Sequence, residues 1–332
     1  MELRNRKILV TGAGGFIGSH LVEALLGSGA CVSAMVRYNG RDDWGMLADL
    51  PAETLRSVQI VRGDIRDPFF VRRAVDGADC VFHLAALIGI PYSYIAPEDY
   101  VSVNVHGTLN ILEACRNAGV ARVIHTSTSE VYGSARYVPI DEEHPLQGQS
   151  PYSASKIGAD KIAESYYASF GLPVVTVRPF NTFGPRQSAR AFVPAAVSQA
   201  LTRDRVVMGA LDPVRDLTYV DDTVQGLIQI GLCDCEEVIG SVVNLGTGVG
   251  HRVGDVIHRV LELVGCEDLI VEQDTSRMRP EKSEVMELVS DNSRARKLCQ
   301  WQPRWSLEDG LIQTIEWIRT SPDKYRPDTY AV

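Results

Sequence analysis

Residues 10–20 read VTGAGGFIGSH and place four glycines where a short apolar strand, Lys7–Thr11, gives way to a helical pattern over Ser19–Ser28. Glycine permits a tight turn, a close approach of the backbone to a pyrophosphate, and close contact between helix and strand. The helix start that follows offers free N–H groups to an anion. The stretch therefore predicts a dinucleotide-binding turn, against the alternative of a purely structural turn. The residues expected to contact the dinucleotide are Gly12, Gly14, Gly15, Phe16, Ile17 and Gly18.

The composition narrows the class of protein. The 332 residues suffice for one large domain or two closely packed ones, and 45% hydrophobic and 23% charged residues are ordinary for a globular protein. A net charge of −9 argues against a surface for nucleic acid or anionic membranes. No apolar run is long enough for a bilayer, and the N-terminus lacks a signal-peptide pattern. The seven scattered cysteines form no C-x-x-C pair, so we expect reduced thiols, a cytoplasmic protein and no metal site.

Strands and helices alternate through the first half of the chain. This alternation predicts an α/β fold with a doubly wound parallel sheet of the Rossmann type, covered by helices on both faces. The predicted strands are Lys7–Thr11, Cys31–Val36, Val58–Arg62, Cys80–Leu84, Val123–Thr126 and Val174–Arg178. The predicted helices are Ser19–Ser28, Phe69–Val75, Tyr100–Ala118 and Ala154–Phe170.

The alternation ends after Pro179, where a polar loop is expected over Asn181–Arg190. A strand over Val242–Leu245 is expected to return to the sheet. We therefore expect a dinucleotide-binding domain over 1–179 that also takes in roughly 217–249, and a smaller C-terminal substrate-binding lobe from 180–216 and 250–325. The helices predicted for this half are Val193–Leu201, Val253–Val264 and Leu307–Ile318.

Charged residues after the second and third strands bear on the choice of cofactor. NAD sites usually carry an acid there for the ribose 2′-OH, whereas an arginine suits the 2′-phosphate of NADP. Arg37 stands near that place and the acids Asp42 and Asp43 come later, which favours NADP over NAD; a solvated Arg37 is the alternative. Asp64 is placed to meet the adenine end of the cofactor, or simply forms a turn.

Two further segments carry acid–base chemistry. Residues 125–133, HTSTSEVYG, place hydroxyls and Glu130 where the fifth strand ends, which indicates either a polar turn or an acid–base site. Residues 150–156, SPYSASK, begin a helix with a capping serine and a proline, so Tyr152 and Lys156 share one helical face. A phenol has a pKa of about 10, too high for a base at neutral pH, and a neighbouring ammonium would lower it.

Several segments together resemble a known family over most of the chain, from about Lys7 to about Ile318. The resemblance is to the extended short-chain dehydrogenase/reductases that act on nucleotide sugars, and it rests on TGAGGFIGSH (11–20), GDIRD (63–67), HLAA (83–86), STSEVYG (127–133), YSASK (152–156) and RPFNTFGPRQ (178–187). The TSE at 128–130 resembles the nucleotide-sugar 4,6-dehydratases. The segments most similar to dehydratases of the legionaminic-acid pathway, which act on an N-acetylglucosamine nucleotide, are IPYSY (90–94), GPRQSAR (184–190) and RPEKSEV (279–285).

The resemblance implies a nucleotide-sugar 4,6-dehydratase that forms a 4-keto-6-deoxy sugar nucleotide, with UDP- or GDP-N-acetylglucosamine as the expected substrate. Tyr152 would take the proton of the sugar 4-OH while NAD or NADP, tightly bound and recycled, takes the C4 hydride and later returns it to C6. Glu130 would take the C5 proton as water leaves C6, with Thr128 on the 4-oxygen and Ser129 beside the leaving group. Some related enzymes carry aspartate in place of Ser129, so here either Glu130 is both base and acid or water relays the proton.

The resemblance also implies ligand contacts and an assembly. The expected cofactor contacts beyond the glycine turn are Arg37, Asp64, Ile65, Leu84, Ala85, Ala86, Tyr152 and Lys156. The expected substrate contacts are Asn181, Arg186, Arg215 and Arg279. Arginine forks suit phosphate oxygens, although each arginine is alternatively a surface ion-pair partner. Enzymes of this kind commonly pair as homodimers through two helices of each subunit, so we expect a homodimer.

Other functions remain open at this point. C4 epimerases and UDP-glucuronate decarboxylases share the fold, and TSEVYG also resembles the decarboxylases. A catalytically inactive, cofactor-sensing binding protein is an alternative from another class. That alternative predicts loss of Tyr152 or Lys156, and both are present.

Overall fold

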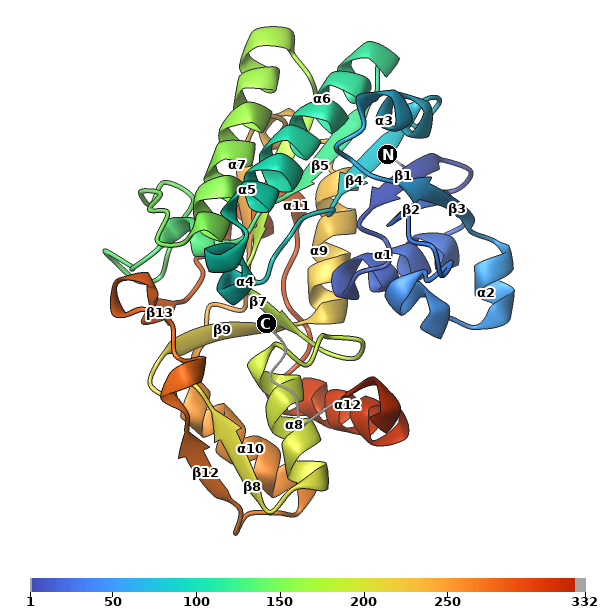
Figure 1. Cartoon of the computed structure of the whole chain (residues 1–332). Helices are drawn as coiled ribbons and strands as arrows, with labels where there is room; N and C mark the ends of the chain where they lie inside the picture. The colour runs from blue at the N-terminus through green and yellow to red at the C-terminus, as the bar shows by residue number, and fades with distance from the viewer. Residues whose placement is uncertain (1, 326–332) are drawn as a thin grey trace.

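The computed structural model describes residues 2–325, and a seven-stranded sheet with the helices that cover it forms the larger part of the molecule (Figure 1). Its order is β10-β6-β5-β4-β1-β2-β3, and every neighbouring pair is parallel. The strands are β1 (Lys7–Thr11), β2 (Cys31–Arg37), β3 (Gln59–Gly63), β4 (Cys80–His83), β5 (Arg122–Thr126), β6 (Val174–Pro179) and β10 (Val242–Leu245). The predicted doubly wound sheet is confirmed, as is the return of Val242–Leu245 to its edge.

Both faces of the sheet are buried under helices. In β1, Ile8 and Val10 belong to one hydrophobic core and Leu9 to the other, because successive side chains of a strand point to opposite faces. The helices of the first face are α1 (Phe16–Gly27), α9 (Val220–Leu232) and α11 (Ser293–Cys299). Those of the second face are α3 (Pro68–Val75), α6 (Gly107–Ala118) and α7 (Pro151–Phe170).

The helix predicted over Tyr100–Ala118 is three consecutive segments instead of one. These are α5 (Pro97–Tyr100), a π-helical turn (Val101–His106) and α6. The wider turn contains the buried Asn104, whose amide donates to Leu87 O at 3.0 Å and to Ser155 Oγ at 2.9 Å. Bonds to distant residues thus accompany the interruption of the regular helix. Two further short helices are α2 (Ala52–Arg56) and α4 (Ile90–Ile95).

Apart from β10, α9 and α11, most of the second half forms a smaller region below the sheet in Figure 1. The start of the predicted polar loop is a strand, and four strands meet in a small sheet around β9, while β8 pairs with β12. The strands are β7 (Asn181–Phe183), β8 (Arg205–Met208), β9 (Val214–Tyr219), β11 (Gly250–Arg252), β12 (Ile270–Gln273) and β13 (Glu287–Leu288). The helices are α8 (Phe192–Thr202), α10 (Val253–Val264) and α12 (Leu307–Thr320), close to their predicted bounds. Within residues 2–325, none of the helices combines the length and hydrophobicity of a membrane span.

The glycine turn is tight because its backbone closes on itself. Gly12 has a φ of 69°, and a Cβ added there would lie 2.7 Å from Ala85 N. A Cβ added at Gly18 would lie 2.2 Å from Gly12 O, a separation that atoms cannot adopt without moving the backbone. Gly27, at the end of the same helix, has no atom within 4 Å of an added Cβ. The glycine at 18 is therefore required by space, and the one at 27 is not.

The contrast between these two glycines can be measured. Gly18→Ala should destabilise the protein by about 2 kcal/mol or more, because the new methyl group must displace the Gly12 carbonyl. Gly27→Ala is the matched control and should be neutral or stabilising by up to about 1 kcal/mol, because alanine favours a helix more than glycine does. Urea unfolding of both variants measures the difference. Equal stabilities would contradict the close contact at Gly18.

Candidate active site

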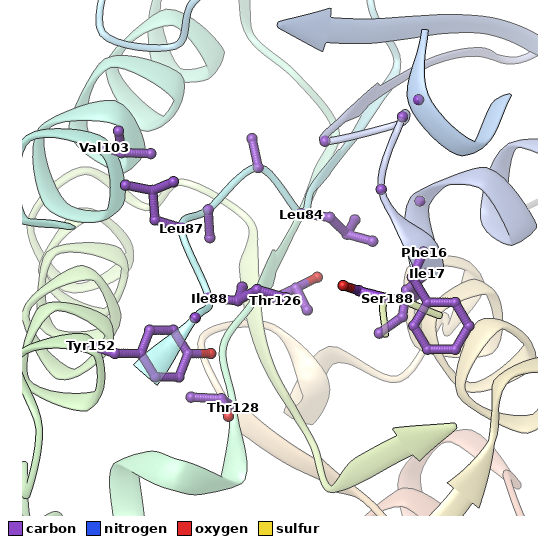
Figure 2. A pocket seen from close by; sticks show the side chains of 18 of the residues that line it. Phe16, Ile17, Leu84, Leu87, Ile88, Val103, Thr126, Thr128, Tyr152 and Ser188 are labelled. Atoms are coloured by element: carbon purple, nitrogen blue, oxygen red, sulfur yellow. The ribbon is translucent and has the colours of Figure 1, made fainter. Parts of the chain in front are cut away.

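A cavity of about 780 Å³ opens at the carboxyl ends of the sheet strands, where the strand order reverses. Open α/β sheets bind their ligands at that place. Figure 2 shows Phe16 and Ile17 at one side of the cavity, with Tyr152 and Thr128 at the other. Every residue predicted to bind the cofactor and all five catalytic candidates line this cavity. The fold thus joins the glycine turn and the acid–base segments in one space.

The glycine turn presents a site for an anion. Helix α1 starts after Gly15, whose φ is −82°, and no side chain caps it. The first N–H groups of the helix therefore remain available to an anion in front of them. Gly14 and Gly15 place no side chain in that space, so the arrangement fits the pyrophosphate of a dinucleotide.

Charged residues lie further along the same side of the cavity. Arg66 Nη2 donates to Asp64 Oδ2 at 2.7 Å, and this hydrogen bond holds the pKa of Asp64 below its usual value. Asp43 accepts from Gly45 N at 2.7 Å and also lines the cavity, as does Arg37. Arg37, the last residue of β2, and Asp43, from the segment that follows, therefore both line this space.

Tyr152 lies in the first turn of α7, where Ser150 and Ser153 form a capping box. Its hydroxyl points into the cavity beside Thr128 (Figure 2). Burial raises the pKa of Tyr152 above its usual value, and a hydrogen bond with Thr128 opposes the rise. The structure thus differs from the sequence-based expectation of a lowered pKa, because burial, helped by the negative charge of Glu130, outweighs the hydrogen bond with Thr128.

Lys156 follows Tyr152 by one helical turn and is buried. Its Nζ donates to Thr126 O, at the end of β5, at 2.8 Å. Burial lowers the pKa of Lys156 to about 8, and the negative charge of Asp160 opposes that shift. The lysine therefore bonds α7 to the sheet directly beneath the cavity.

Sequence reasoning missed Asp160, although it continues the four-residue spacing of the tyrosine and lysine in α7. Its buried carboxylate lies 3.0 Å from His125 Nε2, and it accepts from Ser127 Oγ at 2.9 Å and from Arg178 Nη2 at 3.0 Å. Burial raises the pKa of Asp160, but the hydrogen bond with His125 and the charges around it outweigh burial and lower the pKa overall. This network fixes the floor of the cavity.

Two histidines at strand ends, His83 and His125, bond to other protein groups. His83 Nδ1 lies 2.8 Å from Thr11 Oγ1, and its Nε2 lies 3.0 Å from Thr108 Oγ1. His125 is held by the carboxylate of Asp160. Within residues 2–325, no three or more His, Cys, Asp or Glu side chains gather in a way that would hold a metal ion.

Glu130 lies in a 3₁₀ turn, Ser129–Tyr132, that follows β5. Thr128 caps this turn by accepting from Glu130 N at 3.2 Å. The Glu130 side chain is 13% exposed, and Arg279 Nη1 lies 3.4 and 3.5 Å from its two carboxylate oxygens. The carboxylate therefore lies at the wall of the cavity that also contains the Tyr152 hydroxyl, away from bulk solvent.

A second cavity of about 290 Å³ shares Asn181 and Arg279 with the first and is also lined by Arg215. Arg215 Nη2 lies 3.3 Å from Glu284 Oε1. Arg190 lines both cavities as well. It was missed as a site residue although it stands in the GPRQSAR segment, whose arginines give no sign of which one points inward.

Arg186 is the predicted substrate residue that lines neither cavity. Its Nη2 lies 2.5 Å from Glu23 Oε2 and 2.9 Å from His20 Nδ1, both in α1. Its φ of 66° is in the left-handed region, and the chain turns sharply there, shortly after β7. The structure thus places Arg186 where it ties the loop to α1, and its contact with substrate stays a prediction.

A sheet whose reversal point carries both a dinucleotide turn and a helix with a tyrosine–lysine pair defines an extended short-chain dehydrogenase/reductase. The family model for GDP-mannose 4,6 dehydratase matches residues 9–314, and the chain belongs to that family. The resemblance inferred from the motifs is thereby confirmed. The chain is an enzyme of the nucleotide-sugar dehydratase and epimerase group.

Similar proteins include both kinds of enzyme. A dTDP-glucose 4,6-dehydratase of Streptomyces griseus is 32% identical over 328 residues, covering 96% of this chain and 96% of that protein. A UDP-glucose 4-epimerase of Mycolicibacterium smegmatis is 33% identical, covering 94% and 98% respectively. The solved structure of TunA, an NAD-dependent NDP-hexosamine 5,6-dehydratase of tunicamycin biosynthesis, has a TM-score of 0.83 at 29% identity, covering 98% of this chain and 100% of that one.

The lowered pKa of Lys156 predicts a pH dependence of stability. The pKa of this lysine is 10.5 when exposed and about 8 when buried, so between these values the unfolded state binds more protons than the folded one. Burial of the charged lysine lowers the free energy of unfolding by its full amount below pH 8, and this destabilisation disappears above pH 10.5. Wild-type stability, relative to that of Lys156→Met, should therefore rise across this window.

Chemical unfolding of the two proteins at both ends of the window checks this expectation. Lys161→Met, which changes an exposed lysine on the same helix, is the control and should differ from the wild type by a constant amount. A constant difference for Lys156→Met as well would contradict the burial of a charged lysine.

Proposed function

We propose that this chain is a nucleotide-sugar 4,6-dehydratase that forms a 4-keto-6-deoxy sugar nucleotide. The observation that carries the proposal is the position of Glu130, whose carboxylate lines the same cavity as Tyr152 and Lys156. Oxidation or inversion at C4 requires one base, the tyrosine. Loss of water across C5 and C6 requires a second base for the C5 proton, which the 4-ketone has made acidic. Glu130 supplies that second base.

A bound nicotinamide cofactor would supply the oxidant that accepts hydrogen from C4 and gives it back at C6. The protons fall to the chain's own residues. Tyr152 takes the proton of the 4-OH, and Thr128, bonded to its hydroxyl, holds the 4-oxygen. Lys156, anchored on Thr126 O, favours the phenolate form by its positive charge. Glu130 then takes the proton from C5.

The hydroxyl that leaves C6 must receive a proton. Ser129 stands where some related dehydratases carry an aspartate for this step, and a serine hydroxyl is too weak an acid for it. We infer that Glu130 delivers to the leaving hydroxyl the proton that it took from C5. One carboxylate then serves first as base and next as acid. When hydrogen returns to C6, C5 takes up a proton, which balances the one that Tyr152 took from the 4-OH and releases, so both residues end each turnover in their starting states.

The cofactor is proposed to be NAD or NADP, tightly bound and recycled. The uncapped start of α1 and the glycine turn suit its pyrophosphate. TunA is named as NAD-dependent, whereas Arg37 in the cavity wall favours the 2′-phosphate of NADP. Since hydrogen taken from C4 is returned at C6, the cofactor is not consumed.

The substrate is proposed to be UDP- or GDP-N-acetylglucosamine. Arg215 and Arg279 in the second cavity suit a diphosphate, because one guanidinium group can donate two parallel hydrogen bonds to phosphate oxygens. Asn181, shared by the two cavities, lies between the diphosphate and the reacting sugar in this arrangement. The name of TunA, a hexosamine dehydratase, supports an amino sugar.

A C4 epimerase is the second candidate, because the epimerase relative is as similar to this chain as the dehydratase. An epimerase would use Tyr152 and Thr128 in the same way. It would give Glu130 no proton to remove. The acid in the cavity wall therefore favours the dehydratase over the epimerase, and the product distinguishes them from each other and from a UDP-glucuronate decarboxylase.

We also propose that the chain is divided into a dinucleotide-binding domain and a substrate lobe, and that the protein is cytoplasmic.

We further propose that the protein is a homodimer. The outer faces of α6 and α7 leave Leu109, Tyr167 and Phe170 exposed at 37%, 41% and 54%. Pairing with the same helices of a second copy would cover them. Sedimentation of the purified protein measures the assembly.

Product analysis tests the proposed reaction. The protein, loaded with NAD or NADP, is incubated with UDP- and GDP-N-acetylglucosamine, and the products are examined by mass spectrometry. The expected product has lost one water and carries a 4-ketone. An isomer of unchanged mass would establish an epimerase instead, and carbon dioxide released from UDP-glucuronate would establish a decarboxylase.

Replacement of Glu130 should block the loss of water without blocking the oxidation at C4. Glu130→Gln should still allow oxidation at C4 but lower turnover by about 100-fold or more, because an amide cannot take the C5 proton. Reduced cofactor should then accumulate and be visible by its absorbance. Tyr152→Phe is the control and should prevent that accumulation, since it removes the first base. Full turnover by Glu130→Gln would exclude this carboxylate as the base.

A further inference from the structure

Arg279 stands between two acids and between two cavities. Its Nη1 lies 3.4 Å from Glu130 Oε1 and 3.9 Å from Glu284 Oε1. It lines the large cavity and the smaller one beside it. Its guanidinium group is therefore close to Glu130 in the first cavity and to Arg215 in the second, where the diphosphate is proposed to bind.

The charges of this region are paired among themselves. Arg215 and Arg279 face Glu130 and Glu284, and none of the four side chains is more than 25% exposed. Burial lowers the pKa of Arg279, but the charges of the two glutamates outweigh burial and raise the pKa overall. An incoming diphosphate therefore meets arginines that already have partners and must compete with the glutamates for them.

The ion pair of Arg279 with Glu130 has the geometry of a loose contact. Its separations of 3.4 and 3.5 Å exceed the roughly 2.7–2.9 Å of a strong charge-assisted hydrogen bond. By contrast, Arg186 approaches Glu23 to 2.5 Å. A guanidinium held this loosely can transfer to phosphate oxygens without breaking a short hydrogen bond.

The segment that carries Arg279 is anchored close by. Ser283 Oγ lies 2.6 Å from Tyr94 Oη in α4 and donates to Gln149 O at 2.7 Å. Gln149 Nε2 in turn donates to Lys282 O at 3.0 Å. These bonds fix the backbone beside both cavities, so the arginine can change partners by rotating its side chain.

We propose that Arg279 exchanges partners during binding: the diphosphate of the nucleotide sugar takes it from Glu130 and so releases the carboxylate to act on the sugar. This inference rests on the proposed function. A carboxylate paired with a guanidinium is a weaker base than one that has been released. Arg279 is thus a positioning residue: when the nucleotide binds, the carboxylate of Glu130 is released and becomes a stronger base.

A double-mutant cycle in nucleotide affinity tests the exchange without any turnover. UDP, GDP and dTDP are titrated by calorimetry into the cofactor-loaded wild type, Glu130→Gln, Arg279→Gln and the double variant. If Glu130 competes with the diphosphate for Arg279, Glu130→Gln should bind the nucleotide roughly three- to tenfold more tightly than the wild type. In the Arg279→Gln background the same replacement should give no gain.

The possible results separate three accounts. An equal gain in both backgrounds would show simple repulsion between Glu130 and the diphosphate, and the exchange would be excluded. No gain in either background would exclude it as well, while leaving the proposed function standing. Failure of all three nucleotides to bind the wild type would overturn the proposed function and the exchange together. Arg279→Met repeats the cycle if Arg279→Gln does not fold.

Discussion

The buried carboxylate of Asp160 joins helix α7 to the centre of the sheet, and the site depends on that attachment. Within α7 it lies one turn beyond Lys156, and it bonds to His125 and Ser127 at the end of β5 and to Arg178 in β6. A buried charge is tolerated only where opposite charge and hydrogen bonds surround it, and its loss leaves the partners uncompensated. The network therefore fixes the rotation of α7 about its axis. In this orientation of the helix, the phenol of Tyr152 points into the cavity.

The remaining acid–base groups are placed by the same strand ends. β5 delivers both the carbonyl that holds the lysine ammonium and the turn that carries Glu130. The second half of the chain brings Arg279 to the wall of this cavity and Arg215 to the smaller cavity beside it. In the proposed reaction, the groups that transfer protons and the arginines that hold the substrate diphosphate thus come from different halves of the chain. They meet through one pair of side chains, Glu130 and Arg279.

Local patterns predicted the sheet, and together with the family resemblance they predicted most of the residues that line the cavity. The glycine turn, the alternating strands and the spacing of Tyr152 and Lys156 depend on neighbouring residues, so they can be read without knowledge of distant contacts. The interrupted helix near Asn104 depends on bonds to residues far along the chain, which periodicity does not report. Most strands of the smaller region are too short for alternation to be visible, and the longer β9 is buried along almost its whole length, so its residues do not alternate. Likewise, the segment 184–190 shows where arginines gather but not that Arg186 turns towards α1 while Arg190 faces the cavities.

The edge strand β10 has a consequence for how the protein is made. It pairs with β6 from Val242↔Thr176 to Leu245↔Pro179, after the chain has left the sheet to build β7, β8 and β9. A chain emerging from the ribosome therefore exposes an unpaired β6 edge throughout the synthesis of that excursion, and such edges attract other strands. Completion of the seven-stranded sheet must wait until Leu245 has left the exit tunnel. Chaperone engagement during translation would be concentrated in that interval.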